Sequence, residues 1–476
     1  MKILFAIRDL DFYNPMGITQ LSSVIKENGH NVYSTILSRE NIFDKINEVK
    51  PDIIGYSSCS GEHRTYLELN KKIKSGHKNI FTIMGGAHPT FFPEVLEEGN
   101  LDAICVGEGE YPFKELVEKL DSGEDISNIM NIQIRGKKSN GLRPLIQDLD
   151  KLPYIDRDLF DLDKTIPIMN LIATRGCPYN CSYCYNHAYK KMFPNQRYVR
   201  RRSIDNVIDE IVKTKNKFSH IKFVRFMDDA LVLKEDDYFK DFCKVYKEKV
   251  NLPFYIFTRF DTLTESIANQ LKEAGCATVF MSIETTNQRI RKDILKRNMS
   301  DEDIINGMKL CKKYGINVVG NSMLGLPTSK LEDDINAVDF SIKLGFDVPE
   351  FPIFQPSPKT DIHKFCIEEG ILKEDENYNY YGFTNKSMLN FTEKEKNAQI
   401  NINALGPLTV KHPWLRDLVM NYLIYLPHNV IYKKIYALDK ILTYPKKVFP
   451  MKYSFKERVR IIRKALGIEK TRRKEE

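Results

Sequence analysis

The sequence predicts an α/β protein with two successive parallel sheets and a mostly helical C-terminal region. Short apolar runs alternate with amphipathic helical patterns near the N-terminus, the alternation starts again in the middle of the chain, and irregular helical patterns follow residue 386. With 476 residues, 42% of them hydrophobic and 29% charged, the chain has a globular composition and room for several domains. The expected domains are 1–125, a linker at 126–165, 166–385 and 386–476.

In the first unit, buried strands are expected at the apolar runs 2–7, 31–36, 52–57, 80–84 and 103–106. Helical patterns occur at 18–27, 42–49, 64–75, 92–98 and 113–120. Strands separated by helices form a parallel sheet with helices on both faces, so a doubly wound, Rossmann-like unit is expected.

Glycine and serine follow three of these strands, at the sheet edge where doubly wound domains bind their ligands. The loops are Ser57-Ser58, Gly85-Gly86-Ala87-His88-Pro89 and Gly107-Glu108-Gly109. None has the Gly-x-Gly-x-x-Gly spacing of a dinucleotide site. The sequence therefore predicts a ligand site at these loops but no nucleotide fingerprint.

A second series of strands is expected at 169–173, 222–227, 254–258, 278–283, 317–323 and 350–354. Helical patterns separate them, for example at 203–214, 265–274 and 301–314. Six such units in about 190 residues favour a partial (β/α)6 barrel over a full barrel of eight. Its functional groups are expected at the C-terminal ends of the strands.

Three of the nine cysteines, Cys177, Cys181 and Cys184, lie within eight residues just past the first strand of this series. Thiolates favour zinc, copper(I) or iron–sulfur. Structural zinc normally takes four ligands; no second cysteine pair follows, but His187 would complete a Cys3His site. Three thiolates on a short loop favour a [4Fe–4S] cluster with one iron left open. The other six cysteines are expected to be small buried side chains.

The Cys-x-x-x-Cys-x-x-Cys motif at the first strand end of a partial barrel resembles the radical S-adenosylmethionine (SAM) superfamily. The loops at 85–90 and 106–110 resemble the cobalamin (B12)-binding domain that precedes the barrel in one branch, and the resemblance spans about residues 1–385. It implies a [4Fe–4S] cluster, SAM chelated by the open iron, and cobalamin. It also implies that an electron from a reductant such as flavodoxin or ferredoxin cleaves SAM to a 5′-deoxyadenosyl radical.

The resemblance also implies roles for residues of the barrel. Cys177, Cys181 and Cys184 would ligate the cluster. The usual Gly-Gly-Glu that receives the SAM amino group is absent, and an aspartate occupies that strand end. The expected SAM contacts are Tyr183 with the adenine, Asp228 or Asp229 with the amino group, Glu284 with the ribose hydroxyls, and Arg259 with the carboxylate. The alternatives are helix capping for the aspartates and an ion pair for Glu284. No residue is assigned to catalysis.

For cobalamin, the resemblance implies contacts from the three Gly/Ser loops. The expected residues are Ser57, Ser58, Gly85, Gly86, His88, Gly107, Glu108 and Gly109. One departure concerns the Asp-x-His-x-x-Gly motif whose histidine binds cobalt in many relatives: Asn14 or Tyr13 stands at the histidine position. We expect cobalamin to bind without a histidine on cobalt, and the alternative is a domain that no longer binds it.

The function that the resemblance implies is methylation of an unactivated carbon of a small-molecule or lipid-like substrate. An alternative with the same cofactors is ring formation or another carbon-skeleton change. A non-catalytic cobalamin sensor would need no cysteine motif. A tRNA methylthiotransferase would carry three further N-terminal cysteines, whereas only Cys59 and Cys105 are present.

The net charge of +8 equals the excess at 446–476, where 12 Lys/Arg face 4 Asp/Glu, so no nucleic-acid partner is expected. Phe455, Val459, Ile462 and Leu466 in that tail have helical spacing, which suggests a basic helix and a possible weak membrane-surface contact. The apolar stretch 418–431, near Trp414, is expected to be a core helix; the alternative is a lid or membrane-surface patch. No run is apolar enough to cross a bilayer, and a cytoplasmic protein is expected.

Overall fold

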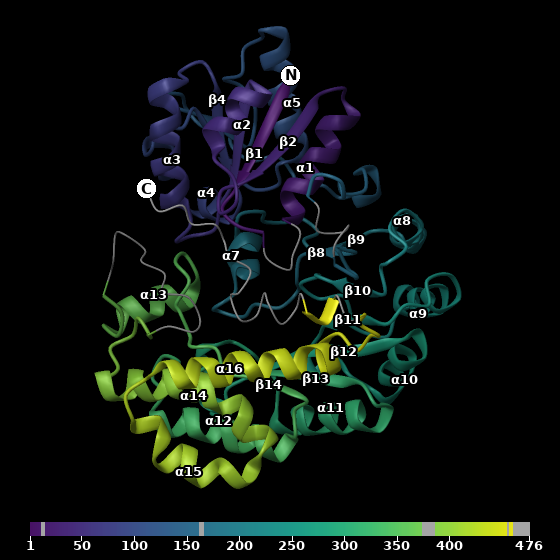
Figure 1. Ribbon diagram of the computed structural model, residues 1–476, viewed down its shortest axis with the longest axis vertical. Helices are drawn as coiled ribbons and strands as arrows, with labels where there is room; N and C mark the ends of the chain where they lie inside the picture. The colour runs from purple at the N-terminus through teal and green to yellow at the C-terminus, as the bar shows by residue number, and fades with distance from the viewer. Residues whose placement is uncertain (11–14, 161–165, 374–385, 455–456, 460–476) are drawn as a thin grey trace. The chain divides into compact units, whose positions relative to one another are not determined.

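A computed structural model of the protein describes residues 1–10, 15–160, 166–373, 386–454 and 457–459 (Figure 1). The chain divides into two compact units, the first ending at Ile166 and the second beginning at Pro167. Each unit contains its own six-stranded sheet.

The first unit is a doubly wound domain. Its strand order is β2-β1-β3-β4-β5-β6, and only β6 is antiparallel to its neighbour. The strands are β1 Lys2–Ile7, β2 Asn31–Ile36, β3 Ile53–Ser57, β4 Phe81–Gly85, β5 Ala103–Cys105 and β6 Ile132–Ile134. The helices are α1 Met16–Glu27, α2 Ile42–Val49, α3 His63–Gly76, α4 Ala87–Phe91, α5 Glu110–Ser122 and the 3₁₀ turns η1 Pro93–Glu97 and η2 Leu149–Lys151.

This sheet is buried on both faces. Along β1, Ile3, Phe5 and Ile7 belong to one hydrophobic cluster, whereas Leu4 and Ala6 belong to the cluster on the other face. A strand covered on both faces has a continuous apolar sequence, which confirms the doubly wound prediction. The stretch expected to be a linker contributes β6 and, at its far end, Phe160 to the same unit.

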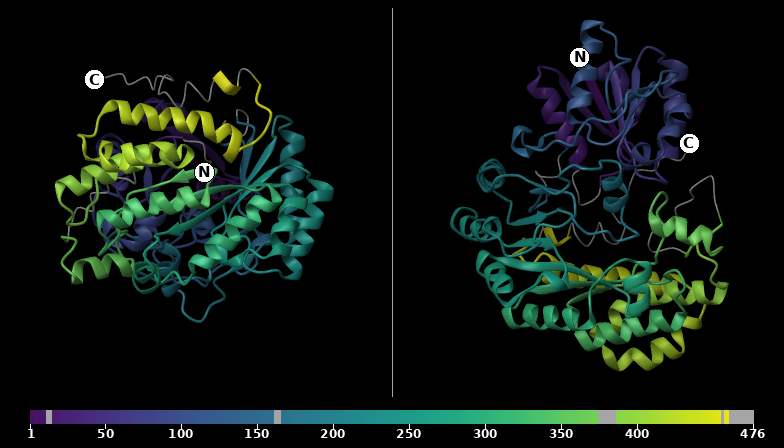
Figure 2. Two further views of the ribbon diagram at one scale, coloured as in Figure 1. Left: turned by 90° about the horizontal axis from the view of Figure 1, so that it is seen from below. Right: turned by 180° about the vertical axis from the view of Figure 1, so that it is seen from behind.

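The second unit contains six parallel strands in the order β14-β13-β12-β11-β10-β7, the open (β/α)6 arrangement that the sequence predicts (Figure 2). The strands are β7 Ile168–Leu171, β10 Phe223–Phe226, β11 Phe254–Phe257, β12 Cys276–Glu284, β13 Asn317–Ser322 and β14 Val348–Glu350. A separate ribbon pairs β8 Thr174–Arg175 with β9 Arg200–Arg201. The helices are α7 Tyr185–Lys191, α8 Ile204–Lys217, α9 Asp237–Lys249, η3 Phe260–Thr262, α10 Glu265–Ala274, the π-helix η4 Ile290–Ile294, α11 Asp301–Tyr314, α12 Leu331–Leu344 and α13 Asp361–Glu368.

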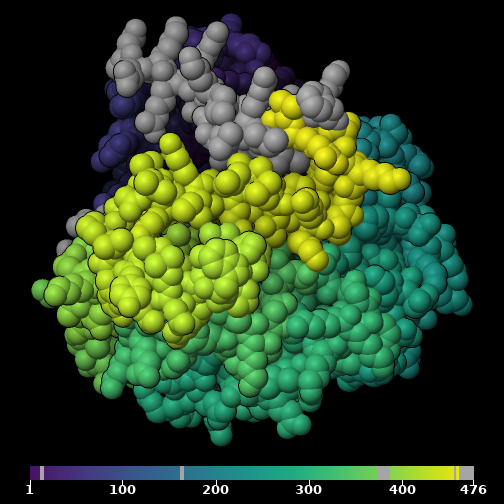
Figure 3. Space-filling view, turned by 60° about the horizontal axis from the view of Figure 1, so that its bottom comes forward, coloured from purple at the N-terminus to yellow at the C-terminus, as the bar shows by residue number. Residues whose placement is uncertain are grey.

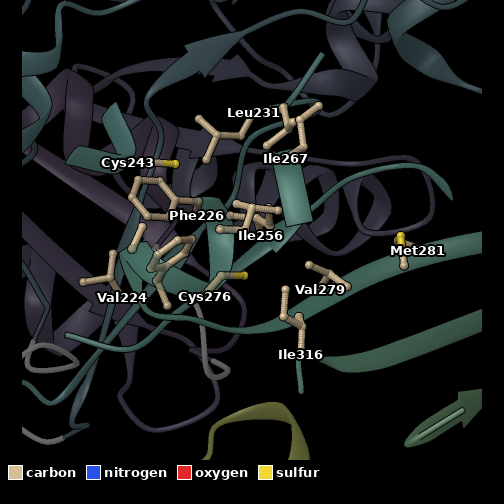
Figure 4. Packing of buried hydrophobic residues seen from close by; sticks show 14 of the residues in the cluster. Val224, Phe226, Leu231, Cys243, Ile256, Ile267, Cys276, Val279, Met281 and Ile316 are labelled. Carbon is tan, nitrogen blue, oxygen red and sulfur yellow. The ribbon is translucent and has the colours of Figure 1, made fainter. Parts of the chain in front are cut away.

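The main core of this unit lies between the sheet and its helices (Figure 4). Val224 and Phe226 of β10 pack into it with Cys243 and Cys276. Of the six isolated cysteines, five are buried as predicted and Cys59 is exposed.

A C-terminal helical region completes the second unit. It comprises α14 Glu393–Lys411, η5 Pro413–Leu415, α15 Arg416–Asn421, η6 Leu423–Tyr425, α16 Val430–Thr443 and the π-helix η7 Tyr444–Val448. α14 packs against α12 and β14, and Ile402 and Leu405 of α14 share a hydrophobic cluster with Phe351. Within the described ranges, no helix is both long and apolar enough to span a membrane.

The core helix expected at 418–431 is wrong. This stretch is broken into short helices, and most of its large apolar side chains face solvent, with Tyr422 67% and Ile431 62% exposed. The basic helix expected in the tail depends on Phe455, Ile462 and Leu466, which lie outside the described residues.

Candidate cofactor sites

The cysteine loop begins at the C-terminal end of the first barrel strand. β8 lies just before the loop and pairs with β9, which follows it in the chain, and α7 begins directly after Cys184. Gly176 has φ +87°, and a Cβ there would lie 2.5 Å from the Tyr198 carbonyl oxygen. Only glycine therefore fits at the entry of the loop.

The π-helix η4 anchors the middle of this loop. The Ser182 amide donates to the Leu295 carbonyl at 3.0 Å, and the Ser182 hydroxyl donates to the Ile294 carbonyl at 2.6 Å. The Ile362 amide donates in turn to the Ser182 carbonyl at 3.1 Å. Hydrogen bonds to η4 and α13 thus hold the short segment that contains the cysteines.

All three cysteines of the loop are free thiols; Cys181 is buried and the other two are half-buried. Burial raises the pKa of Cys184 to about 11 and also raises that of Cys177. In the described part of the chain, no three His, Cys, Asp or Glu side chains converge closely enough to hold a single metal ion. Three thiolates on one short loop suit a [4Fe–4S] cluster, in which each thiolate binds a separate iron. His187, the alternative zinc ligand, directs Nε2 to Asp361 Oδ2 at 2.9 Å.

The two aspartates after β10 differ in their surroundings. Asp228 is buried, and its Oδ1 accepts hydrogen bonds from the amides of Ala173 and Thr174, so it supports the strand end before the cysteine loop. Burial raises its pKa to about 7. Asp229 is exposed and lies close enough to Cys177 and Cys184 to raise the pKa of both thiols. Of the two, Asp229 is the carboxylate accessible beside the cysteines.

Tyr183 and Glu284, two predicted SAM contacts, meet directly. The Tyr183 hydroxyl donates to Glu284 Oε1 at 2.7 Å. Burial and neighbouring Glu284 raise the pKa of the phenol, so it remains a donor. Glu284 has φ +63° and follows a register shift between β12 and β13, a strained conformation that points to a constrained site.

Arg297 completes this group, although it lies in no motif and at no predicted strand end. Its Nη1 lies 3.3 Å from the Tyr183 hydroxyl and 3.5 Å from Glu284 Oε1, and Nη2 donates to the Ser282 carbonyl at 2.8 Å. Although burial opposes its charge, Tyr183 and Glu284 raise its pKa above the usual value. Within the described residues, both contacts of Glu284 use Oε1, which leaves Oε2 for donors of a ligand.

Arg259 is already engaged as a bidentate partner. Its Nε and Nη2 donate to the two carboxylate oxygens of Asp261 at 2.8 and 2.6 Å. Its guanidinium lies over the ring of Tyr179, within the cysteine loop, at 3.8 Å from the centroid. Arg259 therefore clamps the loop, and the fork expected to hold the SAM carboxylate is occupied by Asp261.

In the first unit, the loops after β3 and β4 are packed against each other. Gly86 has φ +97°, and a Cβ there would lie 2.8 Å from both the amide nitrogen and the carbonyl oxygen of Ser58. The Thr90 hydroxyl links this loop to the next, because it donates to the Gly86 carbonyl at 2.7 Å and accepts from the Gly107 amide at 3.0 Å. The predicted loop residues thus form one connected edge.

His88 lies in this edge as a buried, neutral ring. It stacks on His63 at 3.6 Å between centroids, and its Nδ1 lies 3.0 Å from the Ser60 hydroxyl. Burial lowers the pKa of His88 to about 3 and that of His63 to about 4. His63 was not predicted, since only its fold-dependent stacking distinguishes it from other histidines.

Two predicted residues of the third loop have structural contacts. Glu108 Oε2 accepts the Ile146 amide at 2.8 Å, and Gly109 is the N-cap of α5, where a Cβ would contact Cys105 Sγ at 3.5 Å. Asn14 and Tyr13, which stand in place of the cobalt-binding histidine, lie outside the described residues.

The chain matches two family models that correspond to its two sheets: "B12 binding domain" over residues 5–117 and "Radical SAM superfamily" over 171–340. It is 30% identical to an uncharacterized methyltransferase of Pyrococcus horikoshii over 75% of this chain and 79% of the relative. It is 25% identical to the anaerobic magnesium-protoporphyrin IX monomethyl ester cyclase of Rubrivivax gelatinosus, over 77% and 68%.

A solved structure supports the fold over nearly the whole chain. The radical SAM methyltransferase TsrM from Kitasatospora setae, with cobalamin and a [4Fe–4S] cluster bound, superposes with a TM-score of 0.69 at 15% identity, covering 98% of this chain and 99% of that one. The matched families, the open thiol loop and the connected Gly/Ser edge agree with one another. The protein belongs to the cobalamin-dependent branch of the radical SAM superfamily, whose cofactors are a [4Fe–4S] cluster, SAM and cobalamin.

Proposed function

We propose that this enzyme transfers a methyl group to an unactivated carbon of a small-molecule or lipid-like substrate. The main support for the proposal is that the chain has residues suited to both cofactors. In the second unit, three free thiols lie beside the Tyr183–Glu284–Arg297 group, and in the first unit packed Gly/Ser loops form one edge of the sheet. When bound, the cluster and SAM supply one-electron radical chemistry, and cobalamin supplies methyl transfer.

Roles for the barrel residues follow from their contacts. Cys177, Cys181 and Cys184 hold the cluster, and Asp229 receives the SAM amino group because it is the exposed aspartate beside the thiols. Glu284 Oε2 accepts the ribose hydroxyls, while Arg297 orients that carboxylate through its ion pair with Oε1. Tyr183 lies beside the adenine and fixes Oε1.

Asp228 and Arg259 become positioning residues. Asp228 supports the backbone at Ala173 and Thr174, and Arg259 clamps the loop through Tyr179. Because Asp228 Oδ1 binds the backbone, we assign the SAM amino group to Asp229. Because Asp261 occupies the fork of Arg259, we assign no residue to the SAM carboxylate.

Roles in the first unit follow in the same way. Ser57, Ser58, Gly85, Gly86 and Gly107 bring backbone close to cobalamin, and the buried His88–His63 stack supports this edge from within the unit. Glu108 and Gly109 shape the third loop without being free for a ligand.

The decisive experiment supplies SAM with a deuterated methyl group. Protein reconstituted anaerobically with iron, sulfide and cobalamin is incubated with a cell extract and a reductant, either flavodoxin or a chemical one. Methyl transfer predicts a product that carries the labelled methyl group. Ring formation, which the cyclase relative makes the second candidate, predicts 5′-deoxyadenosine and a changed product without label.

A variant without the three cysteines tests whether the reaction depends on the cluster. Replacing Cys177, Cys181 and Cys184 with alanine should abolish labelled product and 5′-deoxyadenosine together. Labelled product from that variant, or stoichiometric zinc in the wild-type protein, would overturn the proposal.

A further inference from the structure

Solvent-exposed apolar side chains gather on one part of the C-terminal region. Of the 11 large hydrophobic residues exposed in the described structure, nine lie between residues 414 and 442. Figure 3 shows the atoms of this region, yellow-green to yellow, on the face turned to the viewer. We call this set the interfacial patch: Trp414, Leu418, Tyr422, Tyr425, Leu426, Val430, Ile431, Leu438 and Leu442. Apolar side chains concentrated in this way mark an interaction surface.

The patch has the composition of a protein surface at a membrane interface. It contains the only tryptophan of the chain, Trp414, which is 78% exposed, together with Tyr422 and Tyr425 at 67% and 54%. Trp and Tyr favour the headgroup level of a bilayer because each combines an apolar ring with a polar tip. Leu and Ile beside them can enter the acyl boundary without any segment crossing the membrane.

Lysines without an ion pair lie beside the patch. Residues 412–454 contain seven Lys/Arg and two Asp/Glu, and three of the basic residues, Arg416, Lys440 and Lys447, pair with carboxylates outside this range. Both carboxylates are ion-paired, Asp417 with Arg416 and Asp439 with Lys411. Lys433, Lys434 and Lys446 are exposed, and none has an ion pair in the described part of the chain. This charge complements an anionic surface.

A hollow beside Leu442 is also lined by apolar and basic residues. Its volume is about 700 Å³, and Ile441, Leu442, Pro445 and Met451 give it an apolar wall. Lys222, Lys446, Lys452 and Arg458 also line it, and among the described lining residues none is acidic, although Glu457 pairs with Lys222. An apolar hollow with a cationic rim suits an acyl chain with an anionic headgroup.

We propose that the interfacial patch binds the surface of an anionic phospholipid bilayer, with Trp414 at headgroup depth. A second copy of the chain is the competing occupant of such a face. Pairing of the patch with a second copy would place two surfaces that both carry unpaired lysines against each other, whereas anionic lipid neutralises these lysines. The proposal does not depend on which reaction the enzyme catalyses.

Trp414 provides the test, since fluorescence of the only tryptophan reports from within the patch. Titrating the full-length protein with phosphatidylglycerol vesicles should shift its emission to the blue, and brominated lipid should quench it. Phosphatidylcholine vesicles should produce a much smaller change, and high salt should reverse the binding. Vesicle co-sedimentation gives the partition coefficient.

Surface variants that keep the reporter test the assignment. Lys433→Glu with Lys434→Glu, and separately Leu418→Ser with Tyr422→Ser, should each lower the partition coefficient by roughly tenfold or more. The control is Lys71→Glu with Lys72→Glu, an exposed lysine pair on α3 of the first unit, which should bind like the wild type.

Three results would overturn the proposal. One is the absence of both spectral shift and co-sedimentation. Another is equal vesicle binding by all the variants, which would assign binding to a different surface. The third is an emission shift that depends on protein concentration without vesicles, accompanied by a dimer in sedimentation equilibrium, because a second copy would then cover the patch.

Discussion

Arg297 is a buried cation whose neighbours come from distant parts of the chain. It contacts Tyr183, 114 residues away in sequence, and Glu284, which closes β12. Sequence reasoning found Tyr183 and Glu284 because each lies at a motif or a strand end. It missed Arg297 because the sequence around it is rich in basic residues, and nothing local distinguishes it from Arg289, Arg291, Lys292 and Lys296. Only the fold shows that Arg297 is the one buried beside the Glu284 carboxylate.

We expect Arg297→Gln to weaken SAM binding and leave the iron content unchanged. Removing one partner of a buried ion pair costs on the order of 3 kcal/mol, and here the loss would fall on the orientation of Glu284. Calorimetric titration of the reconstituted protein with SAM measures it. The control is Arg289→Gln, an exposed arginine that donates to the Thr328 hydroxyl. Wild-type SAM affinity in Arg297→Gln would contradict the assigned role, and additivity with Glu284→Gln would show that the two residues act separately.

Gly86 is predicted to contact cobalamin, and the structure adds a packing role for it. A Cβ at this position would lie 2.8 Å from the amide nitrogen and the carbonyl oxygen of Ser58. A side chain at this position would push apart the loops after β3 and β4, whether or not cobalamin is bound. We expect Gly86→Ala to lower both cobalamin affinity and the thermal stability of the first unit.

The matched control for this prediction is Gly123→Ala. Gly123 has φ +74° at the end of α5, and a Cβ there meets nothing within 4 Å, so it carries only the conformational cost of about 1 kcal/mol. Thermal melting and cobalamin absorbance measure the difference. Equal effects of the two substitutions would show that the contact with Ser58 is not what Gly86 provides.

The bounds of individual strands were more predictable than the contacts of the functional side chains at their ends. β1 and β2 begin and end where the apolar runs do, and β12 extends the predicted run by three residues in total, because buried parallel strands require continuous apolar sequence. The same signal failed at 418–431, since hydrophobicity indicates a preference for apolar surroundings without saying whether they come from the core of the protein or from outside it.

Hydrogen bonds to η4 hold the cysteine loop in place. Ser182→Ala removes the hydroxyl bond to the Ile294 carbonyl, worth about 1 kcal/mol, and loosens the segment between Cys181 and Cys184. We expect faster loss of iron on gel filtration with an unchanged circular dichroism spectrum. Ser341→Ala, which removes a similar hydroxyl bond within α12, serves as the control. Equal iron retention by the two variants would contradict a role for the anchor.

The two units are each complete as packing units. Each hydrophobic cluster of the described residues draws its members from one unit: the clusters around β1 from residues before 167, and those around β7–β14 and α14 from residues after it. The cysteine loop takes its hydrogen bonds from η4 and α13, and the Gly/Ser edge takes its own from Ser58, Thr90 and Gly107. Described residues of its own unit therefore hold each cofactor site.

From this separation we expect the two cofactors to be lost independently. Protein with Cys177, Cys181 and Cys184 all changed to alanine should contain no cluster iron and cleave no SAM, yet bind cobalamin with the wild-type stoichiometry. Gly86→Ala should show the reverse, with wild-type iron content and 5′-deoxyadenosine formation but weakened cobalamin binding. Iron analysis and cobalamin absorbance on the same samples measure both. If the cysteine variant also loses cobalamin, the cofactor sites are coupled, and filling one must alter the packing that supports the other.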